Sequence, residues 1–250
     1  MATVVAAGIH KRFAAPGGAV VEALKDVDLT VGDGEFVCLL GPSGCGKTTL
    51  LNVMAGLLPA DRGTVEIRGG SGRDPVVRTV FQESRLLPWM TVRENLAFVL
   101  DGPERAKTAR IDEWLGRVGL GGTQDYYPRQ LSIGMQQRVS VARGLIVEPD
   151  VLFMDEPFGA LDELTAMTMR EELLGLWEGL GVTIVFVTHN PLEAALLADR
   201  IVIMRGSPGR IVHEEDVSSQ VPRPRDADDL ELWRLARSAV RYLGEGDASP

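Results

Sequence analysis

The sequence predicts an α/β fold, a mostly parallel sheet flanked by helices. Short β-branched runs are bounded by glycine or acidic turns, and helical patterns follow three of them. Runs without polar alternation indicate strands buried on both faces. A glycine-rich loop joins the first of these strands to its helix. Strands are expected at 35–40, 78–82, 151–157, 183–189 and 200–206, and helices at 47–57, 163–180 and 191–200.

Composition limits the possible classes of protein. The 250 residues are enough for one large domain or for a core with a small subdomain. The net charge of −9 argues against a general nucleic-acid binder, although it leaves room for a local basic patch. Cys38 and Cys45 are the two cysteines, so a disulfide scaffold is not expected and a reducing compartment fits better.

The apolar runs are too short to cross a bilayer. None approaches the roughly 18 residues that a membrane-spanning helix needs. The N-terminal segment 1–13 has no basic leader before its apolar run and is not expected to be a secretory signal. The chain can still dock on a protein that spans a membrane.

The middle of the chain differs from the rest. Residues 91–147 are predicted to form helices separated by GP and GLGG breaks, which indicates a helical subdomain inserted into the α/β core. The core is then one discontinuous unit made of 1–90 and 148–212. Residues 213–250 form a C-terminal extension.

The C-terminal extension contains an amphipathic helix at 228–243. We expect this helix to pack on the core through Leu232, Trp233 and Leu235. A regulatory or partner-binding role is the alternative.

The segment GPSGCGKTT, residues 41–49, matches the phosphate-loop pattern G-x-x-x-x-G-K-[ST] between a strand and a helix. Its glycines allow backbone N–H groups to turn around an oxyanion, and the helix N-terminus adds positive partial charge. Lys47 can reach the β- and γ-phosphates, and the Thr48 hydroxyl can ligate Mg²⁺. The expected nucleotide contacts in this loop are Gly41, Pro42, Ser43, Gly44, Cys45, Gly46, Lys47, Thr48 and Thr49.

Cys45 lies inside this loop. We prefer the interpretation that it is simply a small side chain. Inactivation by an oxidant or alkylating reagent is the alternative.

Four polar residues follow the ends of predicted strands. Carboxyl ends of parallel strands meet at one edge of a sheet, where ligands bind. Asp155 is expected to hold Mg²⁺, and Glu156 to polarise the attacking water. Gln82 and His189 end two other strands, where Gln82 can complete the Mg²⁺ shell and either residue can sense the γ-phosphate. Either residue alone would more often be structural, but their shared position at the carboxyl ends of predicted buried strands favours the functional role.

Together these motifs closely resemble the ATP-binding cassette subunits of membrane transporters, from about Val4 to Arg210. GPSGCGKTT resembles the phosphate loop, FQES the glutamine loop and LSIGMQQR the signature. VLFMDEP is similar to the second Walker motif, FGALD to the segment after it, and VTHN to the switch histidine. Six motifs in this order are far more specific than any one. The resemblance implies a RecA-like P-loop core.

The resemblance also implies how the cassette works. Two cassettes would dimerise head to tail around two ATP molecules, and hydrolysis would drive separate permease subunits. Phe13 would stack on adenine, and Asp162 would order the dimer interface. Gln82 would also lie at the groove for the permease. Ser132 and the N–H groups near Gly134 would contact the partner's γ-phosphate.

Ile133 departs from the family pattern, which has glycine there. Either the position is an ordinary helix start, or the branched side chain loosens the composite ATP site. Gln136, Gln137 and Arg138 are expected to brace the loop.

Two weaker features are similar to importers of the nitrate, sulfonate and taurine group: LLPW after the glutamine loop, and SPGRIV followed by PRPR. This resemblance implies a dimer of cassettes bound to permease subunits at the cytoplasmic face of the membrane; a homodimer is expected, and a heterodimer is the alternative. A solute-binding protein would act indirectly, and no nucleic acid is expected. The resemblance does not identify the transported solute, because in this family the cassette does not contact the solute.

Other classes of protein remain as alternatives. A GTPase or small-molecule kinase would share the phosphate loop, but the chain lacks an N-K-x-D guanine motif and an arginine-rich lid. A soluble cassette acting on ribosomes or DNA usually has two cassettes or a coiled-coil insertion. An exporter cassette is often fused to its membrane spans.

Overall fold

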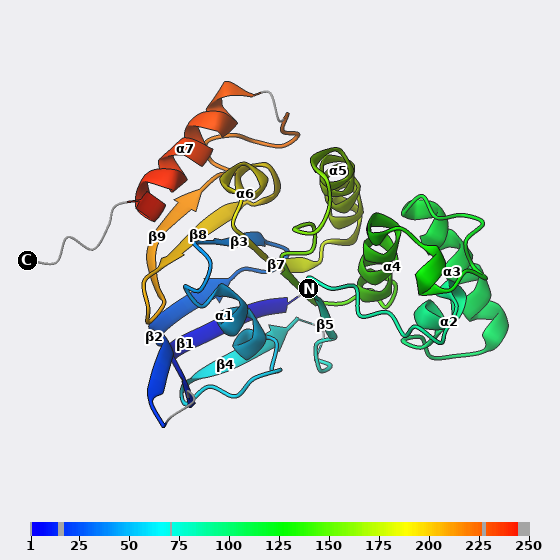
Figure 1. Cartoon of the computed structure of the whole chain (residues 1–250), viewed down its shortest axis with the longest axis horizontal. Coiled ribbons are helices and arrows are strands. Elements are labelled where there is room, and N and C mark those ends of the chain that lie inside the picture. Colours follow the sequence, from blue (N-terminus) through cyan, green and yellow to red (C-terminus); the bar gives the residue numbers. More distant parts are fainter. Residues whose placement is uncertain (1, 15–17, 71, 227–228, 245–250) are drawn as a thin grey trace, which may run out of the picture. The chain divides into compact units, whose positions relative to one another are not determined.

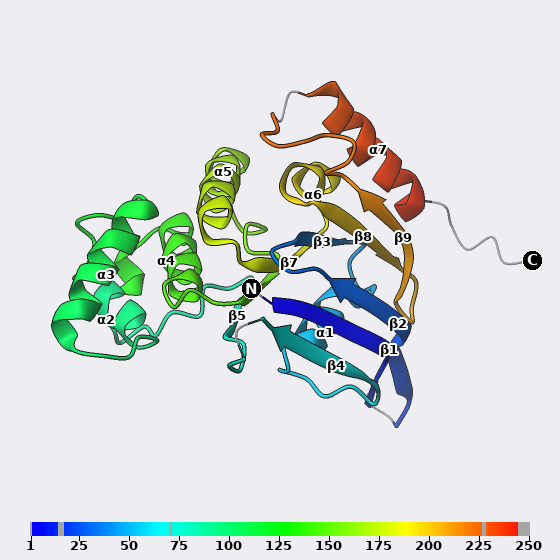
Figure 2. The ribbon, with the colours of Figure 1, turned by 180° about the vertical axis from the view of Figure 1, so that it is seen from behind.

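The computed structural model describes residues 2–14, 18–70, 72–226 and 229–244. It divides into two compact units, one formed by Met1–Pro75 with Val182–Pro250 and the other by Val76–Gly181. Figures 1 and 2 show the elements of each unit from opposite sides. The predicted domain boundaries differ from this division and stay a prediction.

The first unit begins with an antiparallel sheet in the order β2-β1-β4. Its strands are β1 (Ala2–Ala14), β2 (Val20–Val31) and β4 (Arg62–Gly69). Alternate residues at the start of β1, such as Val4 and Ala6, are buried, as expected for a strand with one face on a core. Val4 pairs with Val31 on one side and Ile67 on the other.

The same unit contains the parallel strands that precede the phosphate loop and His189. β3 (Phe36–Leu40) lies between β7 (Thr183–Thr188) and β8 (Arg200–Arg205), parallel to both. All residues of β3 and β7 are buried, which explains the unbroken apolar sequence of β3 and of residues 184–187 in β7. β9 (Arg210–Asp216) adds an antiparallel edge to β8. The predicted α/β fold with a mixed sheet is confirmed.

Three helices of the first unit follow the sequence closely. They are α1 (Lys47–Met54), α6 (Pro191–Leu197) and α7 (Leu230–Gly244). Leu232 and Leu235 of α7 are buried as predicted. The prediction for Trp233 is wrong, since 46% of its surface is exposed. Asp228, the first residue of the predicted helix, lies outside the described residues.

The PRPR segment of the extension is fixed to the end of α6. Arg223 donates to the carbonyl oxygen of Leu197, and Arg225 donates to that of Ala198. These are carbonyl groups that the end of a helix leaves without intrahelical partners. Burial lowers the pKa of Arg225 to about 10, so its guanidinium remains charged at neutral pH.

The second unit contains a parallel pair of strands and four α-helices. β5 (Val77–Val80) pairs with β6 (Val151–Asp155). Three helices fall in the range predicted to be helical, and the fourth, α5, follows β6. These helices are α2 (Val92–Ala97), α3 (Glu104–Arg117), α4 (Ile133–Leu145) and α5 (Glu163–Leu180). Within the described part of the chain, no helix has the length and apolar character to span a membrane.

Candidate nucleotide site

The phosphate loop follows β3 and ends where α1 begins at Lys47. Gly44 and Gly46 have φ of +82° and +93°, in the left-handed region that favours glycine. Gly41 is required for a different reason: a Cβ there would lie 2.4 Å from the carbonyl oxygen of Met204 in β8. The loop's path therefore depends on glycine at all three positions.

Lys47 is held over the loop that precedes it. Its Nζ donates to the carbonyl oxygens of Gly41 and Pro42, at 2.7 and 3.0 Å, and only 5% of its surface is exposed. An ammonium group has three donors, so it can hold two carbonyls and still donate to a phosphate. Thr48, the next residue, is exposed.

Cys45 is buried with 3% of its surface exposed, although Pro42, Ser43 and Gly44 before it are exposed. Burial raises the pKa of the Cys45 thiol, which disfavours the reactive thiolate. The structure thus favours the interpretation that Cys45 fills a small space behind the loop.

His189 is exposed at the end of β7, between two residues that fix the backbone. Thr188 donates from Oγ1 to the Glu193 carboxylate. Asn190 caps α6, since its Oδ1 accepts from the N–H of Leu192 at 3.0 Å. The sequence did not reveal this cap, which positions the histidine at a rigid strand–helix junction.

Phe13 lies near the end of β1, where it pairs with Val21 of β2. It is 41% exposed, and the Lys11 ammonium lies 5.6 Å from its ring centroid. An exposed aromatic ring of this kind can stack on a planar base.

In the second unit, β6 ends at Asp155 and the chain turns at Glu156. Both carboxylates are half-buried. Glu156 has φ of +41°, which is uncommon for a residue other than glycine. Such conformations persist where the surroundings impose them and concentrate at functional sites. This backbone feature was not visible in the sequence.

Gln82 lies two residues beyond β5 and is exposed. The preceding carbonyl, that of Phe81, accepts a hydrogen bond from Gln137 Nε2 at 3.2 Å. The signature helix α4 therefore anchors the backbone that carries Gln82. The prediction that Gln137 braces the signature loop is therefore wrong in its target, since its side chain holds the glutamine loop instead.

The signature segment forms the start of α4. Ser132 is its N-cap, with Oγ accepting from the N–H of Met135 at 3.2 Å. Ile133 is the first residue of the helix and is 63% exposed. A Cβ at Gly134 would lie 3.0 Å from Thr165 Cγ2 of α5, so glycine allows close approach of these helices.

The prediction that Gln136 braces the signature loop is confirmed. Gln136 donates to the carbonyl oxygens of Pro128 and Leu131. The prediction for Arg138 is wrong in its target: it donates to the Val118 carbonyl oxygen at 2.9 Å and pairs with Glu172 of α5, both outside the signature segment.

Asp162 caps α5. Its carboxylate accepts from the N–H and the hydroxyl of Thr165, at 3.0 and 2.7 Å. These bonds lower the pKa of Asp162, so it stays ionised at neutral pH. This capping of α5 accounts for an aspartate at position 162 without any partner chain. The expected role of Asp162 at a dimer interface stays a prediction.

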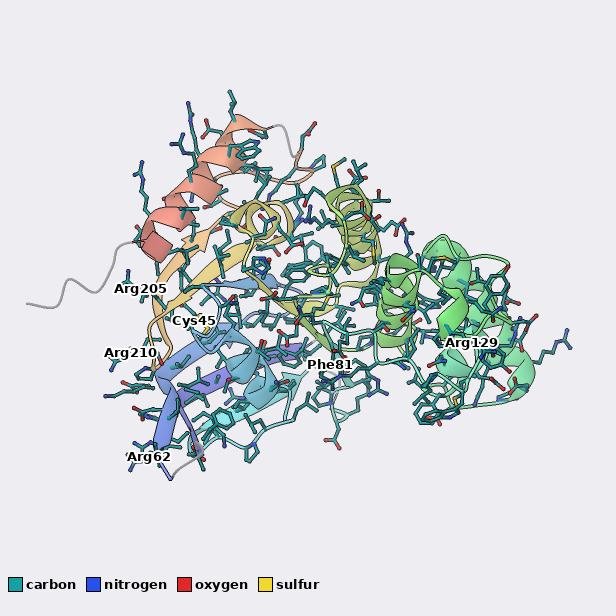
Figure 3. All side chains as sticks on the ribbon, in the orientation of Figure 1. Cys45, Arg62, Phe81, Arg129, Arg205 and Arg210 are labelled. Atoms are coloured by element: carbon teal, nitrogen blue, oxygen red, sulfur yellow. The ribbon has the colours of Figure 1, made fainter. Side chains whose placement is uncertain are left out.

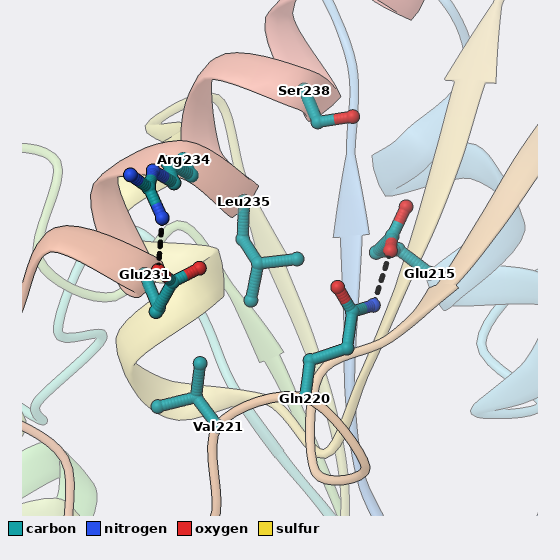
Figure 4. Close-up of a pocket in the computed structure, with 7 residues that line it drawn as sticks. All are labelled: Glu215, Gln220, Val221, Glu231, Arg234, Leu235 and Ser238. Atoms are coloured by element: carbon teal, nitrogen blue, oxygen red, sulfur yellow. Dashed lines mark hydrogen bonds and ion pairs between the residues drawn. The ribbon is translucent and has the colours of Figure 1, made fainter.

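A separate pocket of about 200 Å³ lies at α7 and β9 (Figure 4). Its polar groups interact within the pocket: the Gln220 amide donates to the Glu215 carboxylate, and Arg234 pairs with Glu231. Two carboxylates and one arginine do not favour a phosphate ligand. None of the predicted site residues lines it.

The buried lysine, the turned loop and the following helix define a nucleoside triphosphate-binding protein of the P-loop class. The family model described as ABC transporter matches residues 24–159, more than half of the sequence. The chain therefore belongs to the ABC transporter family, and the predicted resemblance is confirmed.

Relatives from three bacteria show how similar the chain is to known cassettes. It is 45% identical to the taurine import ATP-binding protein of Pelagibacter ubique, over 86% of this chain and 83% of that protein. It is 42% identical to the aliphatic sulfonates import ATP-binding protein of Bacillus licheniformis, over 90% and 89%. It is 44% identical to the nitrate import ATP-binding protein of Synechococcus elongatus, covering 94% of this chain but spanning only 37% of that relative's length.

Solved structures confirm the fold. A dimeric ATP-binding cassette in a post-hydrolysis state with ADP and phosphate has a TM-score of 0.75 and 32% identity, covering 86% of this chain and 98% of that one. A cassette of Clostridium perfringens, part of an ABC transporter complex, has a TM-score of 0.73 and 25% identity, covering 86% and 89%. The RecA-like P-loop core predicted from the sequence is thus confirmed.

Proposed function

We propose that this chain binds and hydrolyses ATP as the nucleotide-binding subunit of an importer. The observation that carries the proposal is the phosphate loop, with Lys47 held over the Gly41 and Pro42 carbonyls. The ammonium and the loop's N–H groups would stabilise negative charge on the β- and γ-phosphates. Phe13 would stack on the adenine ring.

Mg²⁺ is the expected metal, because the candidate ligands are hard oxygen donors. They are the hydroxyl of Thr48, the carboxylate of Asp155 and the side-chain amide oxygen of Gln82. Bound Mg²⁺ supplies positive charge that offsets charge on the phosphates. Within the described residues, no group of three or more His, Cys, Asp or Glu side chains could hold a metal.

Glu156 is proposed to accept a proton from water as the water attacks the γ-phosphorus. The bond from this phosphorus to the β–γ bridging oxygen breaks, giving ADP and inorganic phosphate. His189, at its capped strand end, is proposed to hydrogen-bond the γ-phosphate and position the water. Backbone strain at Glu156 would keep the carboxylate in one orientation.

The working form is proposed to be a dimer of two cassettes. Ser132 and the N–H groups around Gly134 would contact the γ-phosphate held by the partner's phosphate loop. The start of α4 suits this role, because a helix N-terminus favours an anion. The dimeric state of the related solved cassette supports this assembly.

The transported solute is proposed to be a small anion or organic solute of the nitrate, sulfonate or taurine type. The names of the three relatives support this class. The cassette would bind permease subunits at the cytoplasmic face of the membrane, with Gln82 near the contact. A solute-binding protein would act through the permease.

Nucleotide binding by the purified chain tests the proposal. We expect saturable binding of Mg-ATP by the native chain, and loss of productive binding in Lys47→Ala, because the ammonium no longer meets the phosphates. GTP should compete weakly. Tighter binding of GTP than ATP, or transfer of phosphate to a small molecule, would contradict the proposal.

A further inference from the structure

The turn between β8 and β9 presses against the back of the phosphate loop. Gly209, the last residue of this turn, is buried. A Cβ built on it would lie 2.0 Å from the carbonyl oxygen of Cys45 and 3.0 Å from its carbonyl carbon. The first distance is far inside any real Cβ contact. Gly209 does not have a positive φ, so the requirement for glycine here is one of space.

Gly209 is fixed on its other side by β2. Its N–H donates to the Ala23 carbonyl oxygen at 2.9 Å, and its own carbonyl oxygen accepts from the Lys25 N–H at 3.2 Å. Retreat from Cys45 would break these hydrogen bonds. Added volume at Gly209 must therefore move the phosphate loop or detach the turn.

The Cys45 carbonyl belongs to the peptide group whose N–H is that of Gly46. In a planar trans peptide the C=O and the N–H point in opposite directions. Because the oxygen faces Gly209, the Gly46 N–H points away from the turn. Rotating this peptide to accommodate a methyl group would redirect a donor of the phosphate loop.

The same strands limit the loop at two further points. At Gly41, an added Cβ would meet the Met204 carbonyl oxygen of β8. At Gly46, an added Cβ would lie 2.9 Å from the Ala23 carbonyl oxygen of β2. In Figure 3, the Cys45 label lies near those of Arg205 and Arg210, the residues that flank the turn. The loop thus rests on a rigid backbone support.

We propose that Gly209 is a positioning residue for nucleotide binding, which sets the orientation of the Cys45–Gly46 peptide from behind the loop. This inference rests on the proposed ATP-binding function. Gly209 touches no phosphate. It acts through the phosphate-loop backbone, and its replacement should weaken the contacts to phosphate groups.

Calorimetric binding of Mg-ATP and Mg-ADP to the purified full chain provides the test. Gly209→Ala should weaken both by about tenfold or more, the size of a lost hydrogen bond to a charged group. Two controls should bind as the native chain does. Gly175→Ala adds a methyl where no atom outside its own stretch of α5 lies within 4 Å, and Arg210→Ala changes an exposed side chain next to Gly209.

Thermal unfolding without nucleotide separates positioning from loss of fold. We expect Gly209→Ala to keep a cooperative transition while losing most of the upward shift in Tm that ATP gives the native chain. If Gly209→Ala does not fold, Ser207→Gly loosens the turn without adding an atom and should weaken ATP binding to a smaller extent.

The outcomes distinguish the two proposals. If the native chain does not bind ATP, the proposed function fails. If the native chain binds ATP, Lys47→Ala does not, and Gly209→Ala binds like the native chain, the function stands and the role of Gly209 is refuted. If Gly209→Ala cannot be purified, native-like ATP binding by Ser207→Gly refutes the positioning role of Gly209.

Discussion

Gln137 of helix α4 donates a hydrogen bond from Nε2 to the carbonyl oxygen of Phe81, 3.2 Å away. Gln137 is 3% exposed, and Phe81 immediately precedes Gln82. One glutamine of the signature segment is therefore structural, and it holds the backbone of the glutamine loop.

We predict that Gln137→Leu lowers stability by about 1–3 kcal/mol, because the Phe81 carbonyl loses a buried donor. The urea midpoint of unfolding measures this. Gln82→Ala is the matched comparison: Gln82 is exposed, so stability should change little while ATP hydrolysis falls. Equal stability of Gln137→Leu and the native chain would contradict the bracing role.

Ser132 has a structural and a proposed functional role, which substitutions can separate. Ser132→Ala removes the cap of α4 and should cost about 1 kcal/mol. Ser132→Asp keeps an acceptor for the Met135 N–H but places a carboxylate toward the proposed partner phosphate. We predict native-like thermal stability and no ATP-induced dimerisation for Ser132→Asp, by unfolding and light scattering. Dimerisation equal to that of the native chain would rule out the proposed contact.

Ile133 adopts the ordinary helical conformation that any residue can take at this position. Because φ is not positive, glycine offers no conformational advantage. We predict that Ile133→Gly leaves the ATPase rate and ATP-induced dimerisation unchanged and lowers stability by about 0.5 kcal/mol. A faster rate with stronger dimerisation would show instead that isoleucine loosens the composite site.

Burial raises the pKa of both Cys38 and Cys45, by the larger extent at Cys38. We predict slow alkylation of the native chain at neutral pH, with Cys45 reacting only as the pH rises or the chain unfolds. Because the thiol pKa is higher in the folded than in the unfolded chain, each buried cysteine stabilises the fold at pH values below the unfolded pKa of about 8.5. This contribution to stability is lost as the pH rises through the folded pKa. Mass spectrometry after N-ethylmaleimide treatment, with Cys45→Ala as control, measures the reactivity. Rapid modification of Cys45 at neutral pH would be inconsistent with its burial.

The sequence predicted the parts of the fold that depend on local pattern. The unbroken apolar runs of β3, β6 and β7 have the composition of buried parallel strands, and the phosphate loop has glycine wherever the backbone requires it. For Trp233, the helical pattern predicted burial but could not show which side of α7 faces α6 and strands β8 and β9.

Other features depend on segments far apart in the chain. The contact of Gly209 with Cys45 joins residues 164 positions apart, and nothing near Gly209 indicates it. The left-handed backbone at Glu156 is equally invisible, because glutamate rarely adopts it. Local sequence predicts the candidate residues, whereas long-range packing determines their geometry.

The most direct test of the account is ATP hydrolysis by Glu156→Gln alongside ATP binding by the same protein. If Glu156 accepts the proton from the attacking water, binding should match that of the native chain while the turnover rate falls by about 10²–10⁴. The variant should then accumulate as an ATP-bound dimer. Hydrolysis near the native rate by Glu156→Gln would contradict the assignment of the catalytic base.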